Sequence, residues 1–299
     1  MIGNVSLDQL RVLVTIADAG SFSAAGRQLS RAQSAISQSV STLEAMQGVT
    51  LFDRSGHRPR LTETGRVLVA QARMVLSSAA RFEAVATGAR DGLEPELALA
   101  IDPMVPTAPL IESLRGLHGA YPHLPISFST EGLGGALRRL RSGDVALAFC
   151  LLLPAVPQDV VASPLLRVAL TPVVAAGHPL AHLGRPATRA DLESHIQLVL
   201  SDPVDRDGSN YGLANSAPWR FVDLGRRMDF LLAGFGWCRM PEHLVVDQIS
   251  AGALVPMSLA EDARDSGEAL TIYAARRGDT VPGPAGRWLL KDLTSRLAV

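Results

Sequence analysis

Long apolar runs and cysteine are scarce in this chain of 299 residues, and each scarcity excludes a class of protein. The longest apolar run, at 145–153, is far too short to cross a bilayer, since a spanning helix needs about 20 apolar residues. The first residues, MIGNVSLDQL, lack the charged and then apolar pattern of a secretion signal. We therefore expect a cytoplasmic protein with no membrane partner.

The sequence contains only two cysteines, Cys150 and Cys238, which are far apart and show no paired or metal-ligand spacing. Both lie in apolar sequence, so we interpret them as small buried side chains in a reducing compartment; a redox-sensing role is the alternative. The seven histidines form no group with acidic residues at a recognised spacing. We predict no metal, no cofactor and no catalytic residue.

The chain has little net charge, near −1, but the balance differs locally. Residues 21–60 contain five arginines and only two acidic residues, which leaves a net charge of +3. A modest basic patch on a nearly neutral chain favours a site-specific DNA binder over a general nucleic-acid coat. The hydrophobic fraction of 47% is ample for packed cores, and the length favours two or three domains.

Residues 21–65 predict two short helices, a tight turn between them and a basic wing after them. The first helix ends near Leu29, the turn contains Ser30, and the second helix covers 33–46. On the second helix one apolar stripe is predicted from spacings of i, i+4 and i+7: Ile36, Val40 and Leu43. Its other side carries short uncharged hydrogen-bonding side chains: Gln33, Ser34, Ser37, Gln38 and Ser41. Such a face suits a helix in a DNA major groove, where amides and hydroxyls read base edges.

Residues 51–52 and 60–61 predict a β-wing with a turn at 55–56. Its cations would lie along DNA phosphates or in the minor groove. A solvated loop is the alternative for these cations alone, but their position beside the helix pair favours contact. The predicted DNA contacts outside the helical face are Arg31, Arg54, His57, Arg58 and Arg60.

This segment resembles the winged helix-turn-helix of the LysR-type transcriptional regulators. The matching residues are Leu7, Leu10, Phe22, Ala24, Ala25, Leu29, Gln33, Ser37, Leu43, Glu44, Leu51, Phe52, Arg54, Thr62, Thr64 and Gly65. Members of that family often carry Ser at the position of Ala32 and Pro at the position of Ser34. The expected N-cap is therefore weaker here, and Ser30 or the Gln33 side chain is the candidate substitute. The resemblance implies a bacterial transcription factor that binds double-stranded promoter DNA.

A long helix is predicted over 63–89, roughly 40 Å in length at the usual rise per residue. Its apolar residues alternate spacings of four and three, as in a coiled-coil seam: Leu68, Ala72, Val75, Ala79, Phe82, Ala86 and Ala89. A helix packed on its own domain is the alternative; we favour a dimerisation helix because the seam is narrow and the resembled family has one here. A dimer would place two recognition helices about one DNA turn apart, on a near-palindromic operator. The resemblance further implies homodimers that assemble into a homotetramer.

Beyond a linker at 92–95 the pattern changes to alternating strands and helices, which predicts α/β units with a parallel sheet. Regulators of the same family carry a two-lobed α/β effector domain similar to periplasmic ligand-binding proteins. The matching segments are GDVALAF at 143–149, AAGHPLA at 175–181 and GFGWCRMP at 234–241. Two crossovers between the lobes are expected near 162–164 and 266–269.

The expected fold is thus α/β, with an all-α winged helix-turn-helix N-terminal domain at 1–62 and a linker and dimerisation helix at 63–91. The remainder, 92–299, is expected to be the two-lobed, periplasmic-binding-protein-like effector-binding domain. Lobe I would contain 92–163 and 268–299, and lobe II would contain 164–267.

Ligands of open α/β sheets bind at the carboxyl ends of strands, which in a two-lobed protein is the interlobe cleft. The predicted effector contacts are Asp102, Pro103, Met104, Thr107, Glu131, Ser201, Asp202, Trp237 and Arg239. Asp102 stands where family members often have a hydroxyl residue, and it would repel a bare anion unless Arg239 compensates. Asp102 as a helix cap, Arg239 in a structural ion pair and Trp237 in the core are the alternatives. The expected effector is a small polar organic metabolite, such as an aromatic or hydroxylated acid.

The sequence therefore predicts a transcriptional regulator whose promoter binding is modulated by an effector in the interlobe cleft. One alternative is an enzyme on a two-lobed α/β scaffold. Against it, the chain has no nucleophile elbow and no phosphate-loop lysine, and GLGG at 132–135 lacks the strand and helix context of a dinucleotide site. Another alternative is an architectural DNA-bending protein, which would have no use for the large C-terminal part.

Overall fold

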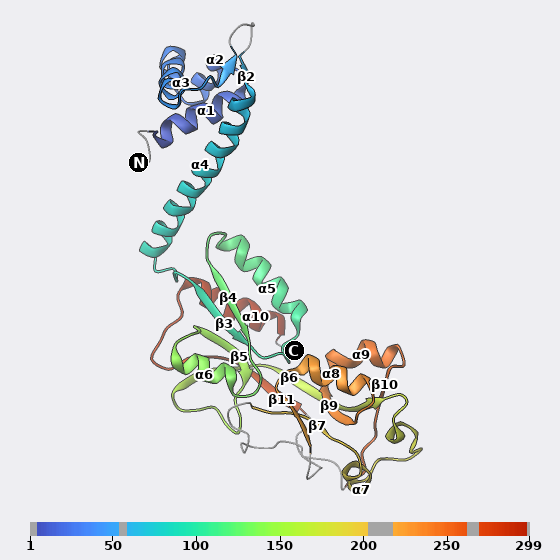
Figure 1. Cartoon of the computed structure of the whole chain (residues 1–299). Helices are drawn as coiled ribbons and strands as arrows, with labels where there is room; N and C mark the ends of the chain where they lie inside the picture. Colours follow the sequence, from blue (N-terminus) through green and yellow to red (C-terminus); the bar gives the residue numbers. More distant parts are fainter. Residues whose placement is uncertain (1–4, 54–58, 203–217, 262–268, 298–299) are drawn as a thin grey trace. The chain divides into compact units, whose positions relative to one another are not determined.

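The computed structural model of this chain describes residues 5–53, 59–202, 218–261 and 269–297. The chain divides into two compact units, Met1–Arg90 and Asp91–Val299 (Figure 1). Each unit has its own hydrophobic core. Within the described residues, no helix is both long and apolar enough to cross a membrane.

The N-terminal unit begins with three helices, α1 (Leu7–Ala19), α2 (Phe22–Gln28) and α3 (Gln33–Gln47). At the start of α1, Ser6 and Gln9 form a capping box, in which each side chain accepts a hydrogen bond from the other residue's backbone N–H. Gly20 ends α1 in the left-handed conformation, with φ of 69°. Helices α2 and α3 occur where the sequence pattern predicts them.

The turn between α2 and α3 is tight because Gly26 has no side chain. A Cβ at this position would lie 2.8 Å from the carbonyl oxygen of Arg31, and the Arg31 N–H donates to the carbonyl of Gly26 at 2.8 Å. Ser30 adopts a φ of 53° in this turn. Ala32 caps α3 without a side-chain hydrogen bond, as its apolar side chain requires.

A short wing follows, in which β1 (Phe52–Asp53) pairs antiparallel with β2 (Arg60–Leu61). Glu44 on α3 holds the start of the wing, because its Oε1 accepts from the N–H of Leu51 at 2.7 Å and of Phe52 at 3.2 Å. The ring of Phe52 also packs edge-on against Phe22, at a centroid distance of 5.3 Å.

Helix α4 (Glu63–Arg90) closes the N-terminal unit, and its first half packs on the unit's own core. Ala72 is only 3% exposed and Leu68 packs beside it, whereas Phe82 is 75% exposed. The predicted seam therefore does not form one surface: Leu68 and Ala72 serve the domain's own packing. The large apolar side chains that α4 leaves exposed are Val67, Met74, Val75, Phe82 and Val85.

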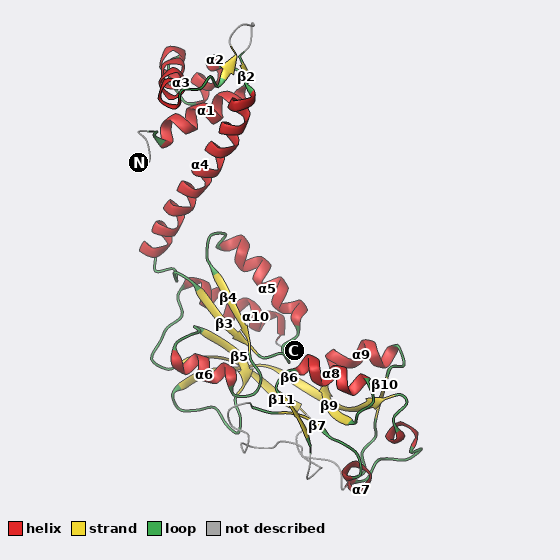
Figure 2. Ribbon diagram, viewed as in Figure 1, coloured by secondary structure: helices red, strands yellow, loops and turns green. Residues whose placement is uncertain are grey.

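The first lobe of the C-terminal unit is a sheet with helices on both faces (Figure 2). Strands β3 (Leu97–Ile101), β4 (Ile126–Thr130) and β5 (Leu147–Leu151) are parallel. Because side chains alternate along a strand, the large residues of β3 and β5 face one way and the small ones the other. The large face packs under α5 (Thr107–Ala120) and α10 (Pro284–Leu297), and the small face packs under α6 (Gly135–Ser142).

Two long antiparallel strands join this lobe to the second. Strand β6 (Val160–Ala175) pairs with β11 (Ala269–Arg277) over its first part, and β11 also pairs antiparallel with β5. From Leu170 onward β6 pairs instead with β9 (Trp237–Pro241) and β10 (Leu254–Pro256). The prediction of a parallel sheet is therefore wrong for this part, where β6 and β11 run antiparallel to every strand with which they pair.

The first crossover is a strand rather than a loop. The first was expected near 162–164, and β6 runs through those residues without a break and changes partners between Ala169 and Leu170. Of the second, expected at 266–269, residues 266–268 lie outside the described residues, and β11 begins at Ala269.

The second lobe adds the parallel pair β7 (Leu198–Leu200) and β8 (Trp219–Phe221) to β9 and β10. Its helices are the 3-10 turn η1 (Pro179–His182), α7 (Arg189–Glu193), α8 (Leu224–Leu232) and α9 (Glu242–Ser250). Asp223 caps α8, since its Oδ1 accepts from the N–H of Arg226 at 2.6 Å.

Replacing Gly65 with Ala tests how α4 docks on the wing. A Cβ at position 65 would overlap the carbonyl oxygen of Leu51, which is backbone and cannot move aside cheaply. We expect Gly65→Ala to destabilise the N-terminal unit by about 1–3 kcal/mol, the usual cost of overpacking. Differential scanning calorimetry of the full chain measures the change.

The matched control is Gly119→Ala, at an open position on α5 where a Cβ would meet nothing within 4 Å. Ala is the better helix former, so we expect this variant to gain up to about 1 kcal/mol. Equal shifts in the two variants would contradict the proposed role of Gly65.

Candidate functional site

The polar face predicted on α3 is present on the surface of the N-terminal unit. Gln33, Ser34 and Gln38 are exposed, and Ser37 and Ser41 are half-buried. The opposite stripe of Ile36, Val40 and Leu43 is buried in the core. The helix thus presents hydroxyls and amides outward without a competing charge, which is a surface suited to base edges rather than to bulk solvent.

Arg31 has a partner within the protein. Its Nη1 and Nη2 donate to the two carboxylate oxygens of Asp8 at 2.7 and 2.9 Å. This pair lowers the pKa of Asp8 and raises that of Arg31. The contact fastens the turn before α3 to the first turn of α1. In this structure the Arg31 guanidinium therefore serves the domain's own geometry, in addition to its predicted role at DNA.

The other predicted cations belong to the wing. Arg60 is exposed on β2, next to the antiparallel pairing with Asp53. Arg54, His57 and Arg58 lie outside the described residues. The wing's contact with DNA therefore stays a prediction.

In the C-terminal unit, the ends of β3 and β4 bring two predicted effector residues side by side. The strands are parallel with Ile101 opposite Thr130, and the N–H of Glu131 donates to the carbonyl of Ile101 at 3.1 Å. Asp102 is held from the other side, where its N–H donates to the carbonyl of Phe149 on β5 at 2.8 Å. Asp102 and Glu131 therefore share the carboxyl edge of the lobe I sheet, as predicted.

Asp102 is almost fully buried, and its Oδ1 accepts from the N–H of Met104 at 2.9 Å. Burial raises the pKa of its carboxyl to about 6, against the smaller lowering effect of that hydrogen bond. Pro103 is half-buried, and the turn after β3 points Met104 into the main core. The effector contact predicted for Met104 stays a prediction. Thr107 is exposed at the first position of α5.

Glu131 and Asp202 are each paired with an arginine of α6. Glu131 accepts from the Nε of Arg139. Asp202, which follows β7 in the second lobe, accepts from the Nη1 and Nη2 of Arg138 at 2.6 and 2.9 Å. The structure thus places these two predicted residues on either side of one helix, where the lobes meet.

Sequence reasoning missed Arg138 and Arg139 as site residues. Neighbouring arginines on a short helix usually face solvent. Nothing in the sequence indicates that Arg139 binds Glu131, 8 residues away, or that Arg138 binds Asp202, 64 residues away. The nearest signal was GLGG at 132–135, considered only as a nucleotide motif. Gly132 lies close to the carbonyl of Val222, so this loop is also where the chain of lobe I approaches lobe II.

The remaining predicted residues lie elsewhere in the second lobe. The N–H of Ser201 donates to the carbonyl of Phe221 at 2.8 Å, which continues the β7–β8 pairing. Trp237 is 0% exposed, its Nε1 donates to the carbonyl of Leu192 at 3.3 Å, and its ring packs in a separate core cluster. Trp237 therefore lies in the core, which was the alternative stated for this residue. Arg239 is half-buried on β9, and its carbonyl accepts from the Nη2 of Arg227 at 2.5 Å.

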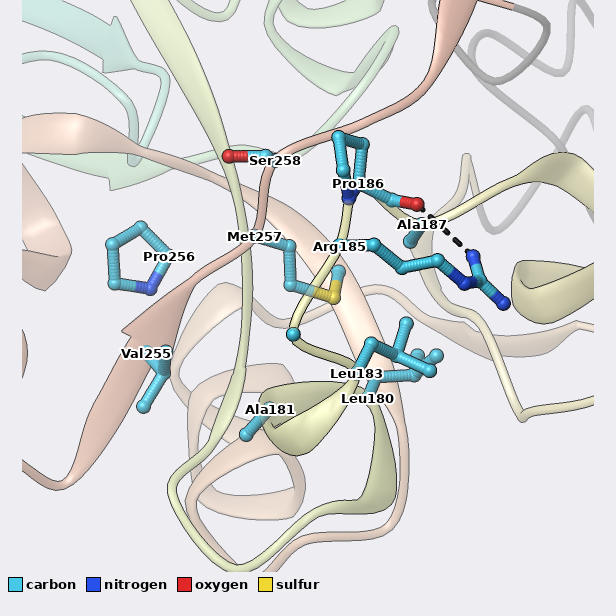
Figure 3. Close-up of a pocket in the computed structure, with 11 residues that line it drawn as sticks. Leu180, Ala181, Leu183, Arg185, Pro186, Ala187, Val255, Pro256, Met257 and Ser258 are labelled. Carbon is cyan, nitrogen blue, oxygen red and sulfur yellow. Dashed lines mark hydrogen bonds between the residues drawn. The ribbon is translucent and has the colours of Figure 1, made fainter.

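A pocket of about 330 Å³ opens between η1 and β10, away from these residues. Figure 3 shows Met257 and Leu183 directed into it, with Arg185 at its rim donating to the carbonyl of Pro186. The guanidinium of Arg185 is also bound to Asp191 at 2.6 and 2.9 Å. None of the predicted effector residues lines this pocket.

Two family models match the chain. The model described as "Bacterial regulatory helix-turn-helix protein, lysR family" matches residues 7–66, and the model described as "LysR substrate binding domain" matches residues 90–298. The first contains the whole polar face of α3, and the second contains both lobes of the C-terminal unit.

Individual proteins agree with these models. The chain is 30% identical to the probable HTH-type transcriptional regulator YhaJ of Escherichia coli (strain K12) over 296 residues, 97% of this chain and 96% of that one. It is 31% identical to a probable hydrogen peroxide-inducible genes activator of Mycobacterium avium over 254 residues, 82% and 80% of the two chains. The structure of the Corynebacterium glutamicum OxyR C206 mutant covers 99% of this chain and 96% of its own, with a TM-score of 0.55 and 24% identity, and shares the fold.

The buried carboxyl of Asp102 makes a pH prediction. Its pKa in the folded chain, about 6, is above the ordinary value of 3.8, so between these values the folded state binds more protons than the unfolded state. The free energy of unfolding should therefore fall as the pH rises from about 4 to about 6, by at most about 3 kcal/mol. Asp102→Asn removes this loss, so it should be more stable than wild type at about pH 7 and equal to it at about pH 4, as urea denaturation measures.

Asp191→Asn is the control of opposite sign. Hydrogen bonds from Arg185 and Thr188 hold the pKa of Asp191 well below its usual range. This variant should lose stability at neutral pH and lose less as the pH falls. If both variants shift stability in the same direction at neutral pH, the assigned state of Asp102 is wrong.

Proposed function

This chain belongs to the LysR family of transcriptional regulators, and we propose that a small polar organic metabolite, bound between the two lobes of its effector domain, modulates its binding to promoter DNA. It is a DNA-binding regulator and not an enzyme. As a bacterial regulator of this family it would act in the cytoplasm, where its promoters are.

The polar face of α3 is the observation that carries the DNA-binding half of the proposal. Gln33, Ser34 and Gln38 point away from a core that buries the opposite side of the helix completely. Side-chain amides and hydroxyls can donate and accept at base edges, whereas the arginines of the wing add affinity through phosphates. The same domain would thus separate sequence reading from electrostatic attraction.

Helix α4 supports the proposal of a homodimer, which would assemble further into a homotetramer. From Met74 onward it leaves Met74, Val75, Phe82 and Val85 exposed along one side. Exposed apolar side chains at this density on one helix indicate an interface. The proposed seam is therefore this outer face, in place of Leu68 and Ala72, and it would set two α3 helices on the two halves of a near-palindromic site.

For the effector we propose the cleft edge formed by Asp102, Thr107, Glu131 and Asp202, with Arg239 on β9 as a further contact. The acids would accept from hydroxyl or amine groups of the ligand, and an arginine would bind a ligand carboxylate with two parallel hydrogen bonds. A hydroxylated acid or an amino acid derivative offers both kinds of group.

Peroxide sensing, suggested by the name of the Mycobacterium avium relative, fits this chain poorly. Cys150 is buried, and burial together with the charge of Asp102 raises the pKa of its thiol to about 12. Cys238 is completely buried, and burial raises the pKa of its thiol as well. A sensor cysteine needs an accessible thiolate, which neither residue provides.

Two experiments test the proposal as a whole. In a mobility-shift assay, the full chain should bind the DNA upstream of genes next to its own far more tightly than a scrambled duplex of equal length. In a thermal-shift screen of metabolites, a true effector should raise the melting temperature, because a ligand that binds only the folded state stabilises it. Equal binding to both duplexes would contradict site-specific recognition.

Substitutions in α3 and in the wing should have different effects on DNA binding. We expect Gln33→Ala to change the preferred base at one position of each half-site, with a loss of about 1–3 kcal/mol on the native operator. Arg60→Ala should lower the affinity for all DNA sequences alike. It should also reduce the dependence of that affinity on salt concentration by the amount expected for about one phosphate contact. Footprinting and titrations at several salt concentrations distinguish the two effects. A Gln33→Ala variant with unchanged base preference would show that another face reads the DNA.

Phe82→Asp tests the proposed dimer face. Phe82 is 75% exposed in the single chain, so the substitution should not harm folding, but in a dimer it would bury a charge between helices at a cost of several kcal/mol. We expect sedimentation velocity to show half the mass at concentrations where the wild type is dimeric. The control is Val281→Asp, at a position 80% exposed and outside α4, which should leave the mass unchanged. If both variants keep the wild-type mass, α4 is not the main interface.

A further inference from the structure

Among the residues that the structure describes, an ion pair of near-ideal geometry connects the two lobes of the C-terminal unit. Arg138 belongs to α6 of the first lobe, and Asp202 follows β7 of the second. Two parallel hydrogen bonds connect them, at 2.6 and 2.9 Å. The two partners are 64 residues apart in the sequence and belong to different lobes. This contact therefore exists only while the lobes keep their present positions relative to each other.

The loop before α6 is shaped for this contact. Gly134 has a φ of 74°, in the left-handed region that favours glycine. A side chain there would overlap both the carboxylate of Asp202 and the guanidinium of Arg138. The carboxylate of Asp202 thus lies against bare backbone, in a place that any larger residue at 134 would fill.

The two partners differ in their access to solvent. The side chain of Asp202 is 14% exposed, whereas that of Arg138 is 42% exposed. The guanidinium can therefore be reached from solvent while its present carboxylate is largely enclosed. Beside it, Arg139 has a side chain that is 46% exposed and is bound to Glu131, which lies next to Asp102 where β4 and β3 have ended. An anion that arrives here meets two accessible guanidinium groups, and at Arg138 it must compete with Asp202, the carboxylate of the other lobe.

We propose that the ion pair between Arg138 and Asp202 is a latch that holds the effector domain in its resting state, and that a carboxylate-bearing effector opens it by replacing Asp202 on Arg138. The exchange replaces one carboxylate by another, so the guanidinium is never left without a counter-charge. The released Asp202 no longer ties the second lobe to α6. This inference rests on the proposed effector site and names the chemistry and the regulation of that site.

Hydrogen–deuterium exchange of the full chain tests the latch without any ligand. In Arg138→Gln and Asp202→Asn, backbone amides of both the loop at 132–135 and the strand β7 should exchange about fivefold faster, the effect expected for loss of a well-formed, partly exposed pair. Because the partners act as one unit, the double variant should exchange no faster than either single variant.

The control is a second bidentate pair on the same helix. Arg141 donates to Asp159 at 2.7 and 2.8 Å, and both residues belong to the first lobe. Arg141→Gln and Asp159→Asn should leave exchange in β7 unchanged. The latch is refuted if the Arg138 and Asp202 variants leave β7 unaltered, or if the control pair alters it equally.

A separate exchange experiment tests whether a carboxylate displaces Asp202. Sodium acetate serves as the carboxylate probe, and sodium chloride at equal ionic strength is the reference. Acetate should speed exchange in β7 of the wild type more than chloride does, and the two salts should act alike on Arg138→Gln. Equal effects of the salts on the wild type would overturn displacement by a carboxylate.

Footprinting on operator DNA, in the absence of effector, tests whether the ion pair controls DNA binding. Arg138→Gln and Asp202→Asn should shift the footprint in the same direction, and the control pair should not. Faster exchange with unchanged footprints would show that the pair joins the lobes but does not control DNA binding. A chain with no specific footprint at all would refute the proposed function, while the exchange measurements would still decide whether the latch exists.

Discussion

The antiparallel pairing of β6 with β11 is the contact on which the rest of the C-terminal unit depends. Val160–Ala175 passes through both lobes as one strand, pairing with β11 in its first part and with β9 and β10 in its second. The first connection between the lobes is therefore a continuous hydrogen-bonded strand and not a loop. The register of β6 against β11 shifts once. Leu166 is opposite Ile272 and Pro164 is opposite Tyr273, so Leu165 has no residue opposite it on β11. Proline cannot donate to a neighbouring strand, so this irregularity is the natural place for β6 to twist when the lobes move.

The cleft inherits its chemistry from this arrangement. Parallel strands in the first lobe bring Asp102 and Glu131 to one edge, and α6 supplies Arg139 to Glu131 and Arg138 to Asp202 of the second lobe. Glu131 and Asp202 are thus already neutralised by arginines before any ligand binds. In the proposed mode of regulation, a ligand carboxylate would have to replace one of these carboxylates, so binding and rearrangement would be one event.

Much of the fold could be predicted because local rules determine it. Ser6 and Gly20 bound α1, Asp223 caps α8, and the i, i+4, i+7 stripe of Ile36, Val40 and Leu43 identifies the buried side of α3. The errors arise where a residue's role depends on a distant partner. The sequence around Trp237 is equally compatible with a ligand contact and with a core position. Only the packing of Trp237 against η1 and α7 shows that it lies in the core. Leu68 and Ala72 follow a heptad pattern, but the pattern does not reveal that their partner is α1 of the same domain and not a second copy. Arg138 and Arg139 had no sequence signal, because their acidic partners are brought to them only by the folded lobes.

The two units use charge in different ways, which bears on how this regulator responds to its surroundings. In the proposed mode of DNA binding, recognition by α3 would rely on uncharged groups and change little with ionic strength, whereas the wing's arginines would bind phosphates with an affinity that falls steeply as salt rises. In the effector unit the ion pair between Arg138 and Asp202 is also partly exposed to solvent, and added salt screens it as well. A rise in ionic strength therefore acts on DNA affinity and on the lobe contact together. Substituting Arg60 or Arg138 one at a time separates the effect of salt on DNA affinity from its effect on the lobe contact. The two residues belong to different compact units, each with its own core.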